Sequence, residues 1–204
     1  MRKAATKYAA LVIPITLAVT FPGAAGGRDE AGDAEKAKAT SQPVATTGPA
    51  TVPAASVPAE FTPHEVVSGE FRLKAPAAWK KAERPGSTAV MTLYIDEQRS
   101  SLRVNAMDLA PGTGLQQTVA ASEAQIPRAN KNFKHAGTEY FRAGGAQAAR
   151  VMFDVTARGQ NLRVMQVLLS HGKKLYALTF TAAADKFPSL APTFDQVIAS
   201  AQFQ

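Results

Sequence analysis

Residues 147–181 have the sequence QAARVMFDVTARGQNLRVMQVLLSHGKKLYALTFT. Three runs rich in apolar and β-branched residues are separated here by two turns, Arg158-Gly159-Gln160 and His171-Gly172-Lys173. Runs of this kind, bounded by glycine-containing turns, are typical of strands joined by hairpins. The stretch therefore predicts three strands that form an antiparallel meander.

The middle run predicts the most deeply buried strand. Val164–Leu169 is apolar at almost every position, so both of its faces need cover. A strand that is apolar on both faces lies in the centre of a sheet with material packed on each side. Two helical segments elsewhere in the chain can supply that cover.

The first predicted helix follows Ala110–Gly114 and has Leu115, Val119 and Ile126 on a helical repeat, with Pro127 as its stop. The second carries one apolar stripe near the end of the chain, formed by Leu190, Phe194, Val197, Ile198 and Ala201. Because Pro188 and Pro192 disfavour a single uninterrupted helix, we expect a short turn and then a regular helix from about Ala191.

Further strands are predicted upstream of the meander. The first is 70–75, ended by Pro76. A hairpin of 90–95 with 102–109 follows, and a strand around 139–141 leads into the Gly144-Gly145 turn. The single tryptophan, Trp79, is expected to pack across the end of the sheet. The predicted fold class is α+β, with an antiparallel β-sheet sandwiched between helices.

The N-terminal residues predict an export signal over 1–25. Arg2, Lys3 and Lys7 precede an apolar run, and small residues follow it. Cleavage after Ala25 and cleavage after Gly26 fit equally well. The alternative is a retained anchor, because the run of about 18 residues is at the lower limit for crossing a bilayer.

Residues 26–62 form a predicted disordered linker, and the folded domain is assigned to 63–204, with its beginning near Phe61. Four prolines, Pro43, Pro49, Pro53 and Pro58, favour extended conformations over this linker. Such a spacer is useful to a protein whose N-terminus is tethered. Inherited low-complexity sequence is the alternative explanation.

Composition excludes several kinds of site. The chain has no cysteine, which rules out disulfides, thiolate-bound metals and a cysteine nucleophile. Without the three basic residues of the predicted signal, 20 basic residues face 16 acidic ones, and the small basic clusters lie at loops and strand ends. Nucleic acid needs a more concentrated basic face, so we expect none as partner and consider an anionic envelope surface instead.

No set of catalytic or metal-ligating residues stands out. The candidates are His64, His135, His171, Asp108, Glu139 and Asp154. The segment from His64 resembles a zinc-peptidase motif, but Ser68 stands where the second histidine is needed. Gly-x-Ser-x-Gly is also missing. We therefore predict no enzyme activity, no catalytic residue, no metal and no cofactor, and we assign no binding residue.

A glycine-rich helix entrance is the remaining candidate for ligand binding. Gly112-Thr113-Gly114 resembles the start of a dinucleotide-binding motif, in which phosphate sits at a helix N-terminus. Gln117 occupies the place of the third glycine, and no parallel βαβ unit follows. The sequence therefore gives little support for a phosphate site here.

Residues 61–204 resemble the PsbP-like superfamily, which includes bacterial envelope proteins of the DcrB type and a Ran-binding nuclear import factor. The resemblance rests on 71–76 followed by Trp79, on 144–148, on 175–180 and on 194–200. The ending Ser200-Ala201-Gln202-Phe203 departs from it by one extra residue before the aromatic. The resemblance implies an antiparallel sheet between helices and a non-enzymatic accessory or binding role.

Two functions follow as hypotheses. The first is an exported adaptor that docks on an envelope or membrane-associated assembly, with a protein partner and with the Pro-rich spacer giving reach. The second is a periplasmic carrier of a small ligand or metal that uses a cleft near Gly112–Gly114. A hydrolase with an unfamiliar site is held in reserve.

Overall fold

The computed structural model describes residues 50–51, 60–82, 89–96, 100–129, 132–157 and 159–204. The predicted signal at 1–25 and most of the predicted linker at 26–62 lie outside the described residues. Among the described residues, no helix is long and apolar enough to span a membrane.

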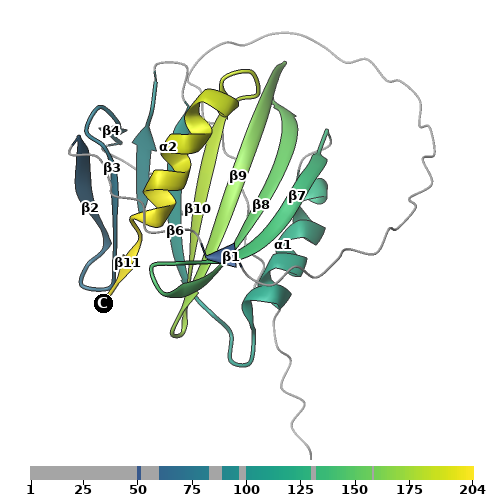
Figure 1. Ribbon diagram of the computed structural model, residues 1–204. Coiled ribbons are helices and arrows are strands. Elements are labelled where there is room, and N and C mark those ends of the chain that lie inside the picture. The colour runs from purple at the N-terminus through teal and green to yellow at the C-terminus, as the bar shows by residue number, and fades with distance from the viewer. Residues whose placement is uncertain (1–49, 52–59, 83–88, 97–99, 130–131, 158) are drawn as a thin grey trace, which may run out of the picture.

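An eight-stranded sheet forms the body of the molecule (Figure 1). Its order is β1-β7-β8-β9-β10-β6-β5-β4, and every neighbouring pair is antiparallel except β1 with β7. The strands are β1 (Ala50–Thr51), β4 (Lys80–Lys81), β5 (Met91–Tyr94), β6 (Ser101–Asp108), β7 (Lys134–Ala143), β8 (Ala146–Ala157), β9 (Gln160–His171) and β10 (Lys174–Ala183). The predicted meander is confirmed as β8, β9 and β10, and the predicted hairpin as β5 and β6.

A second sheet of three strands was not predicted. It has the order β11-β3-β2 and contains β2 (Phe61–Val67), β3 (Phe71–Pro76) and β11 (Gln202–Phe203). β3 corresponds to the strand predicted as the first of the domain, and β2 precedes it. β2 lacks a clean apolar alternation and contains Pro63, which an edge strand tolerates because one side of its backbone needs no partner.

Two helices complete the fold among the residues that the structure describes, and the effect of their prolines differs from expectation. α1 (Leu115–Ala129) continues past Pro127, and α2 (Phe187–Ala199) begins before Pro188 and contains Pro192. Pro188 occupies the first turn, where a missing N–H costs nothing. Pro192 removes one helical hydrogen bond, and the buried side chains Phe194, Val197 and Ile198 offset that loss by packing.

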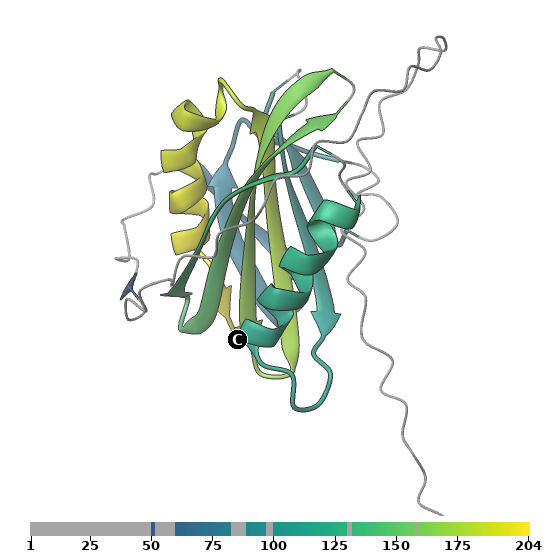
Figure 2. The ribbon, with the colours of Figure 1, turned by 90° about the vertical axis from the view of Figure 1, so that its right-hand side faces the viewer.

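The large sheet has a core on each face. α1 packs against β8 and β9 on one face, and α2 together with the three-stranded sheet covers the other (Figure 2). A mostly antiparallel α+β fold with two helices is thus confirmed. The prediction of a sheet between helices did not include the three-stranded sheet, which shares the second face with α2.

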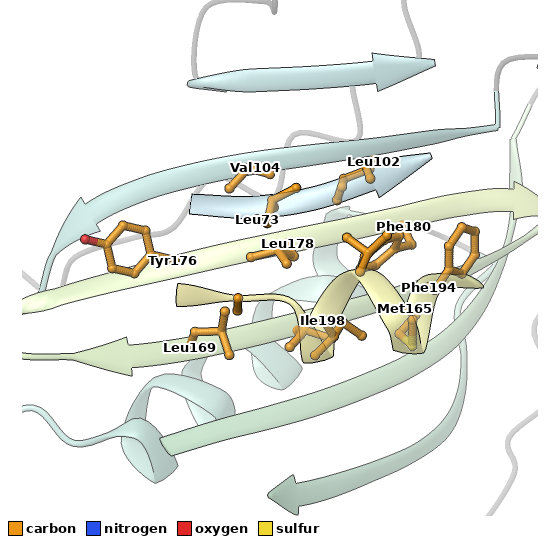
Figure 3. Close-up of a cluster of buried hydrophobic side chains, with 14 of the residues drawn as sticks. Leu73, Leu102, Val104, Met165, Leu169, Tyr176, Leu178, Phe180, Phe194 and Ile198 are labelled. Carbon is orange, nitrogen blue, oxygen red and sulfur yellow. The ribbon is translucent and has the colours of Figure 1, made fainter. Parts of the chain in front are cut away.

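The core beneath α2 is the larger of the two. Side chains from β3, β6, β9, β10 and α2 meet there, among them Leu73, Leu102, Val104, Met165, Leu169, Tyr176, Leu178, Phe180, Phe194 and Ile198 (Figure 3). Trp79 belongs to this core, as expected, with its ring 6.2 Å from that of Phe194. The central strand β9 is buried throughout Val164–Leu169, which confirms the prediction for it.

Candidate functional site

The last residues of the chain are tied firmly to the domain. β11 pairs with β3, so that Phe203 lies opposite Phe71, and the N–H of Gln204 donates to the carbonyl of Glu70 at 3.1 Å. Just before β11, the hydroxyl oxygen of Ser200 accepts the N–H of Lys74 at 2.7 Å and lies 2.6 Å from the Val197 carbonyl. One serine thus closes α2 and starts the turn into β11.

Four rings meet at this end of the molecule. Phe203 stacks on Phe71 with ring centres 4.9 Å apart and on His171 at 4.5 Å. Tyr176 completes the group, 4.6 Å from Phe71 and 5.4 Å from Phe203. Phe71 and Tyr176 are buried, Phe203 is partly buried and His171 is exposed. The cluster therefore extends from the core out to solvent.

The turn between β7 and β8 packs directly on β11. Gly144 has φ +57°, and a Cβ at this position would overlap the carbonyl oxygen of Ala201 and lie 3.3 Å from the Phe203 ring. Only glycine combines that backbone conformation with that close approach. Gly145 also has a positive φ, but a Cβ there would meet nothing within 4 Å.

Charged groups surround the rings. Lys174 Nζ lies 2.7 Å from a carboxylate oxygen of Glu70, and the Tyr176 hydroxyl donates to the same oxygen at 3.3 Å. The hydrogen bond from Lys174 lowers the pKa of Glu70, and the same bond raises the pKa of Lys174. Burial raises the pKa of Tyr176, and the Glu70 charge adds to that rise.

We call the surface formed by Glu70, His171, Lys173, Lys174 and Phe203 the C-terminal surface. It has an aromatic centre and a polar, charged rim, which is the arrangement found in protein–protein interfaces. Aromatic residues at the centre of such a surface contribute most of the binding energy when a partner covers them. This geometry therefore suits the binding of a protein partner better than catalysis.

His171 is the only predicted candidate that joins this surface among the described residues. Asp108 lies at the end of β6, opposite Lys174 in the sheet register, beside the C-terminal surface. Glu139 lies 3.7 Å from Arg150, which also contacts Asp195 of α2 at 2.5 Å. Asp154 accepts two hydrogen bonds from Arg163 at 2.7 and 2.9 Å, and these lower its pKa. Glu139 and Asp154 are therefore both engaged by arginines.

His135 forms a separate polar cluster with two residues that no sequence motif indicates. Its Nε2 lies 3.1 Å from the Thr138 hydroxyl and 3.5 Å from the Glu123 carboxylate, to which Thr138 also donates. In a nucleophile–base–acid relay the two partners occupy different ring nitrogens. Here both approach Nε2, so the cluster lacks the geometry of a catalytic triad.

His64 lies on the inner face of the three-stranded sheet. It pairs with the buried Leu73, and its Nε2 is buried with no hydrogen-bond partner among the described residues. Burial lowers the pKa of His64, and the positive charge of Lys81 lowers it further. The surroundings of this imidazole at the edge of the core therefore favour its neutral form.

The glycine-rich entrance of α1 is already capped. The Gly114 N–H donates to the side-chain oxygen of Gln117 at 3.3 Å, and the Thr118 hydroxyl donates to the Gly114 carbonyl at 3.0 Å. Gln117, the residue in the place of the third glycine, thus uses an N–H that a phosphate would need. Across the ranges that the structure describes, no three His, Asp or Glu side chains gather closely enough to hold a metal ion.

Sequence reasoning missed Phe203 and Gly144 as parts of one site. The Gly144-Gly145 pair predicts a turn, but nothing in the sequence indicates that this turn packs on the last strand. Phe203 stands out in the sequence only by its unusual spacing from Ser200. Their roles depend on contacts between residues more than fifty positions apart, Gly144 with Ala201 and Phe203 with Phe71, and no local sequence pattern indicates such contacts.

No family model matches this sequence, and no curated protein matches it. Several solved structures are similar to this chain. Cyanobacterial PsbP (CyanoP) from Synechocystis sp. PCC 6803 is similar with a TM-score of 0.60 at 12% identity, covering 72% of this chain and 94% of its own. LpqN of Mycobacterium tuberculosis, described as involved in cell envelope biogenesis, is similar with a TM-score of 0.54 at 15% identity, covering 71% and 90%.

The chain has the PsbP-like fold. The segments on which the sequence resemblance rested come together within this fold. Phe71 of the opening strand, Gly144 of the turn and Tyr176 of the late strand all lie around β11. Phe203, which one extra residue separates from Ser200, lies between Phe71 and His171. The C-terminal surface thus forms around β11, where this sequence departs from the expected pattern.

Proposed function

We propose that this protein is an exported accessory protein that docks on an envelope or membrane-associated protein assembly through the C-terminal surface. The observation that carries the proposal is the aromatic stack of Phe71, Phe203 and His171, which reaches solvent inside a charged rim. Rings held by a rigid framework can bind a partner without loss of side-chain freedom. The proposed partner is a protein.

The location rests on the N-terminal sequence. Residues 1–25 have the three parts of an export signal, so the mature chain would be periplasmic or secreted, with a retained anchor as the alternative. Residues 26–62 would then separate the folded domain, 63–204, from that terminus. The likeness to LpqN, an envelope biogenesis protein, supports the same compartment.

A binding role suits the chemistry of the described side chains better than an enzymatic one. Asp154 is engaged by Arg163, and the Glu139 carboxylate lies beside Arg150. His135 meets both of its polar neighbours through one nitrogen. We therefore propose a protein that is not an enzyme and that needs no cofactor for docking.

The test is crosslinking of the full chain in its native envelope, followed by pull-down and mass spectrometry. The proposal predicts a reproducible stoichiometric protein partner. Shortening residues 26–48 should preserve capture, and unfolding the domain should abolish it. Recovery of the chain alone after efficient crosslinking would refute the adaptor function. A ligand-dependent rise in Tm in its place would favour a carrier.

A further inference from the structure

β7 is the outermost long strand of the large sheet, with only the two-residue β1 beyond it, and its two halves are built differently. Its first half begins with Lys134 and contains a bulge, where the pairing with β8 shifts between His135 and Gly137. Lysine and bulges are devices that stop other strands from pairing with an exposed edge.

The second half, Thr138–Ala143, pairs regularly with β8 and has neither a lysine nor a bulge. Its two charged residues are engaged within the domain, Glu139 beside Arg150 and Arg142 as donor to the Gly145 carbonyl. This half is open to strand addition.

A segment of the predicted linker already lies on that half. β1 pairs in parallel with β7, with Ala50 opposite Phe141 and Thr51 opposite Arg142. In the described part of the chain, these are the only strand pairs on this side of β7. The edge therefore accepts a strand, but β1 covers only two of its six regular residues.

The sequence around β1 explains why the pairing is so short. Pro49 precedes Ala50, and Pro53 follows two residues after Thr51. Proline has no N–H to donate and is excluded from the interior of a paired strand. Only three residues lie between these prolines, so this segment cannot extend along Thr138–Ala143. It is a weak occupant that a longer strand can displace.

This edge runs into the C-terminal surface. β7 ends at Ala143, and the next residue, Gly144, is packed against Ala201 and Phe203. Figure 1 shows β1, β11 and the β7–β8 turn at the same end of the molecule. The exposed ring of Tyr140 lies on this edge as well, with 38% of its surface accessible. One partner can therefore contact both regions.

We propose that Thr138–Ala143 is a strand-acceptor edge, occupied by Ala50–Thr51 in the free protein and by an extended segment of the docking partner in the assembly. The proposal rests on the adaptor function and names its mode of recognition, in which backbone hydrogen bonds give affinity and alternate side chains give specificity. The linker segment then acts as a latch that keeps the edge from pairing with unrelated strands.

The register of β1 indicates the chemistry of the partner segment. Ala50 lies opposite the buried Phe141, so the partner needs a small apolar residue at that position. Thr51 lies opposite the exposed Arg142, where a hydroxyl or a carboxylate fits. The partner segment should therefore alternate small apolar residues with polar or acidic ones, without proline, over about six positions.

A disulfide latch tests the proposal in the full chain, which contains no native cysteine. Thr51→Cys with Arg142→Cys places two thiols at paired positions of neighbouring strands, a separation that a disulfide can bridge. The control is Thr51→Cys with Lys80→Cys, because β4 lies at the opposite edge of the sheet. We expect rapid oxidation of the first pair only, measured by loss of alkylatable thiol. Equal oxidation rates for the two cysteine pairs would contradict the pairing of Ala50–Thr51 with β7.

The same variant then tests partner binding by crosslinking in the native envelope. The oxidised latch should capture at least about tenfold less partner than wild type, a loss of about 1.4 kcal/mol, and reduction with dithiothreitol should restore capture. The Arg142→Cys single variant shows the effect of losing that arginine alone. Undiminished capture by the oxidised latch would overturn the acceptor edge while leaving the adaptor function intact. Absence of any partner with wild type would overturn both.

Discussion

The two ends of the described chain are held by very different means. Residues 200–204 are fixed by strand pairing, a serine hydroxyl, ring stacking and the close approach of Gly144. Ala50–Thr51 are held by two residue pairs between prolines. The comparison shows that a terminal strand becomes integral to a fold when its side chains join the core. A strand held by only two residue pairs is expected to remain exchangeable.

The largest effect is expected where the turn meets the last strand. Gly144→Ala should lower the free energy of unfolding by about 3 kcal/mol or more, from the left-handed backbone and the overlap with Ala201 together. Gly145→Ala should cost only about 1 kcal/mol, because its φ is also positive but its Cβ meets nothing. Urea denaturation of both variants measures the difference. Equal losses would show that the contact with β11 is unimportant.

The next effect is on the stack itself. Phe203→Ala should destabilise the protein by about 2 kcal/mol, because a partly buried ring loses its contacts with Phe71 and His171. The exposed neighbour Gln202→Ala is the control and should change stability by less than about 0.5 kcal/mol. If both substitutions were neutral in thermal denaturation, the C-terminal strand would be as dispensable as β1.

The helix that precedes the last strand is anchored by an ion pair. Asp195→Asn weakens the 2.5 Å contact with Arg150, whose side chain is only 19% exposed, and should cost about 1 kcal/mol. Asp185→Asn, an exposed acid just before α2, is the matched control and should be close to neutral. Chemical denaturation of the two variants would contradict this role if they behaved alike.

Acid should weaken the sheet to which the last strand is added. Because burial lowers the pKa of His64 below its ordinary value of 6.5, the unfolded chain binds the proton more readily than the folded one. The free energy of unfolding should therefore fall as pH drops below about 6.5, and level off below the folded pKa. His64→Gln should remove this part of the pH dependence. The difference between variant and wild type, followed from about pH 7.5 to about pH 5, isolates it.

The smallest effect on stability is expected for β1, Ala50–Thr51. Thr51→Pro should abolish the pairing of β1 with β7 and still change the free energy of unfolding by less than about 0.5 kcal/mol. Hydrogen exchange should accelerate in the variant at the one amide of Phe141 and Arg142 that faces β1, and stay slow at the other, which faces β8. A large drop in stability would show that β1 is part of the fold and no latch.

Sequence patterns are sufficient for elements whose information is local. The turns at Gly159 and Gly172 and the apolar run of β9 are enough to predict the meander, with the strand pairs that the fold contains. The second sheet was out of reach, because β2 carries no clean alternation and β11 has only two residues. Both exist through pairing with β3, which the sequence placed in a single sheet.

The candidate site could not be predicted either, because it too depends on contacts between residues far apart in the sequence. The sequence shows His171 as a histidine in a hairpin turn, and its neighbour in space is Phe203, thirty-two positions away. The proline rules also failed where packing outweighs propensity. α2 runs through Pro192 because Phe194, Val197 and Ile198 are buried along its length.

The most direct test of docking through the C-terminal surface compares charge changes on two exposed surfaces of the domain. His171→Glu with Lys173→Glu alters the C-terminal surface at exposed positions, and Lys80→Glu with Lys81→Glu alters the far edge of the sheet by exposed lysines. The measurement is the amount of envelope partner crosslinked to each full-length variant, with Tm as the check on folding. We predict loss of capture for the first variant alone; its Tm should fall only by the modest amount that loss of the His171–Phe203 stack causes, and the variant should remain fully folded at the temperature of the capture experiment. Wild-type capture by that variant would contradict docking through this surface.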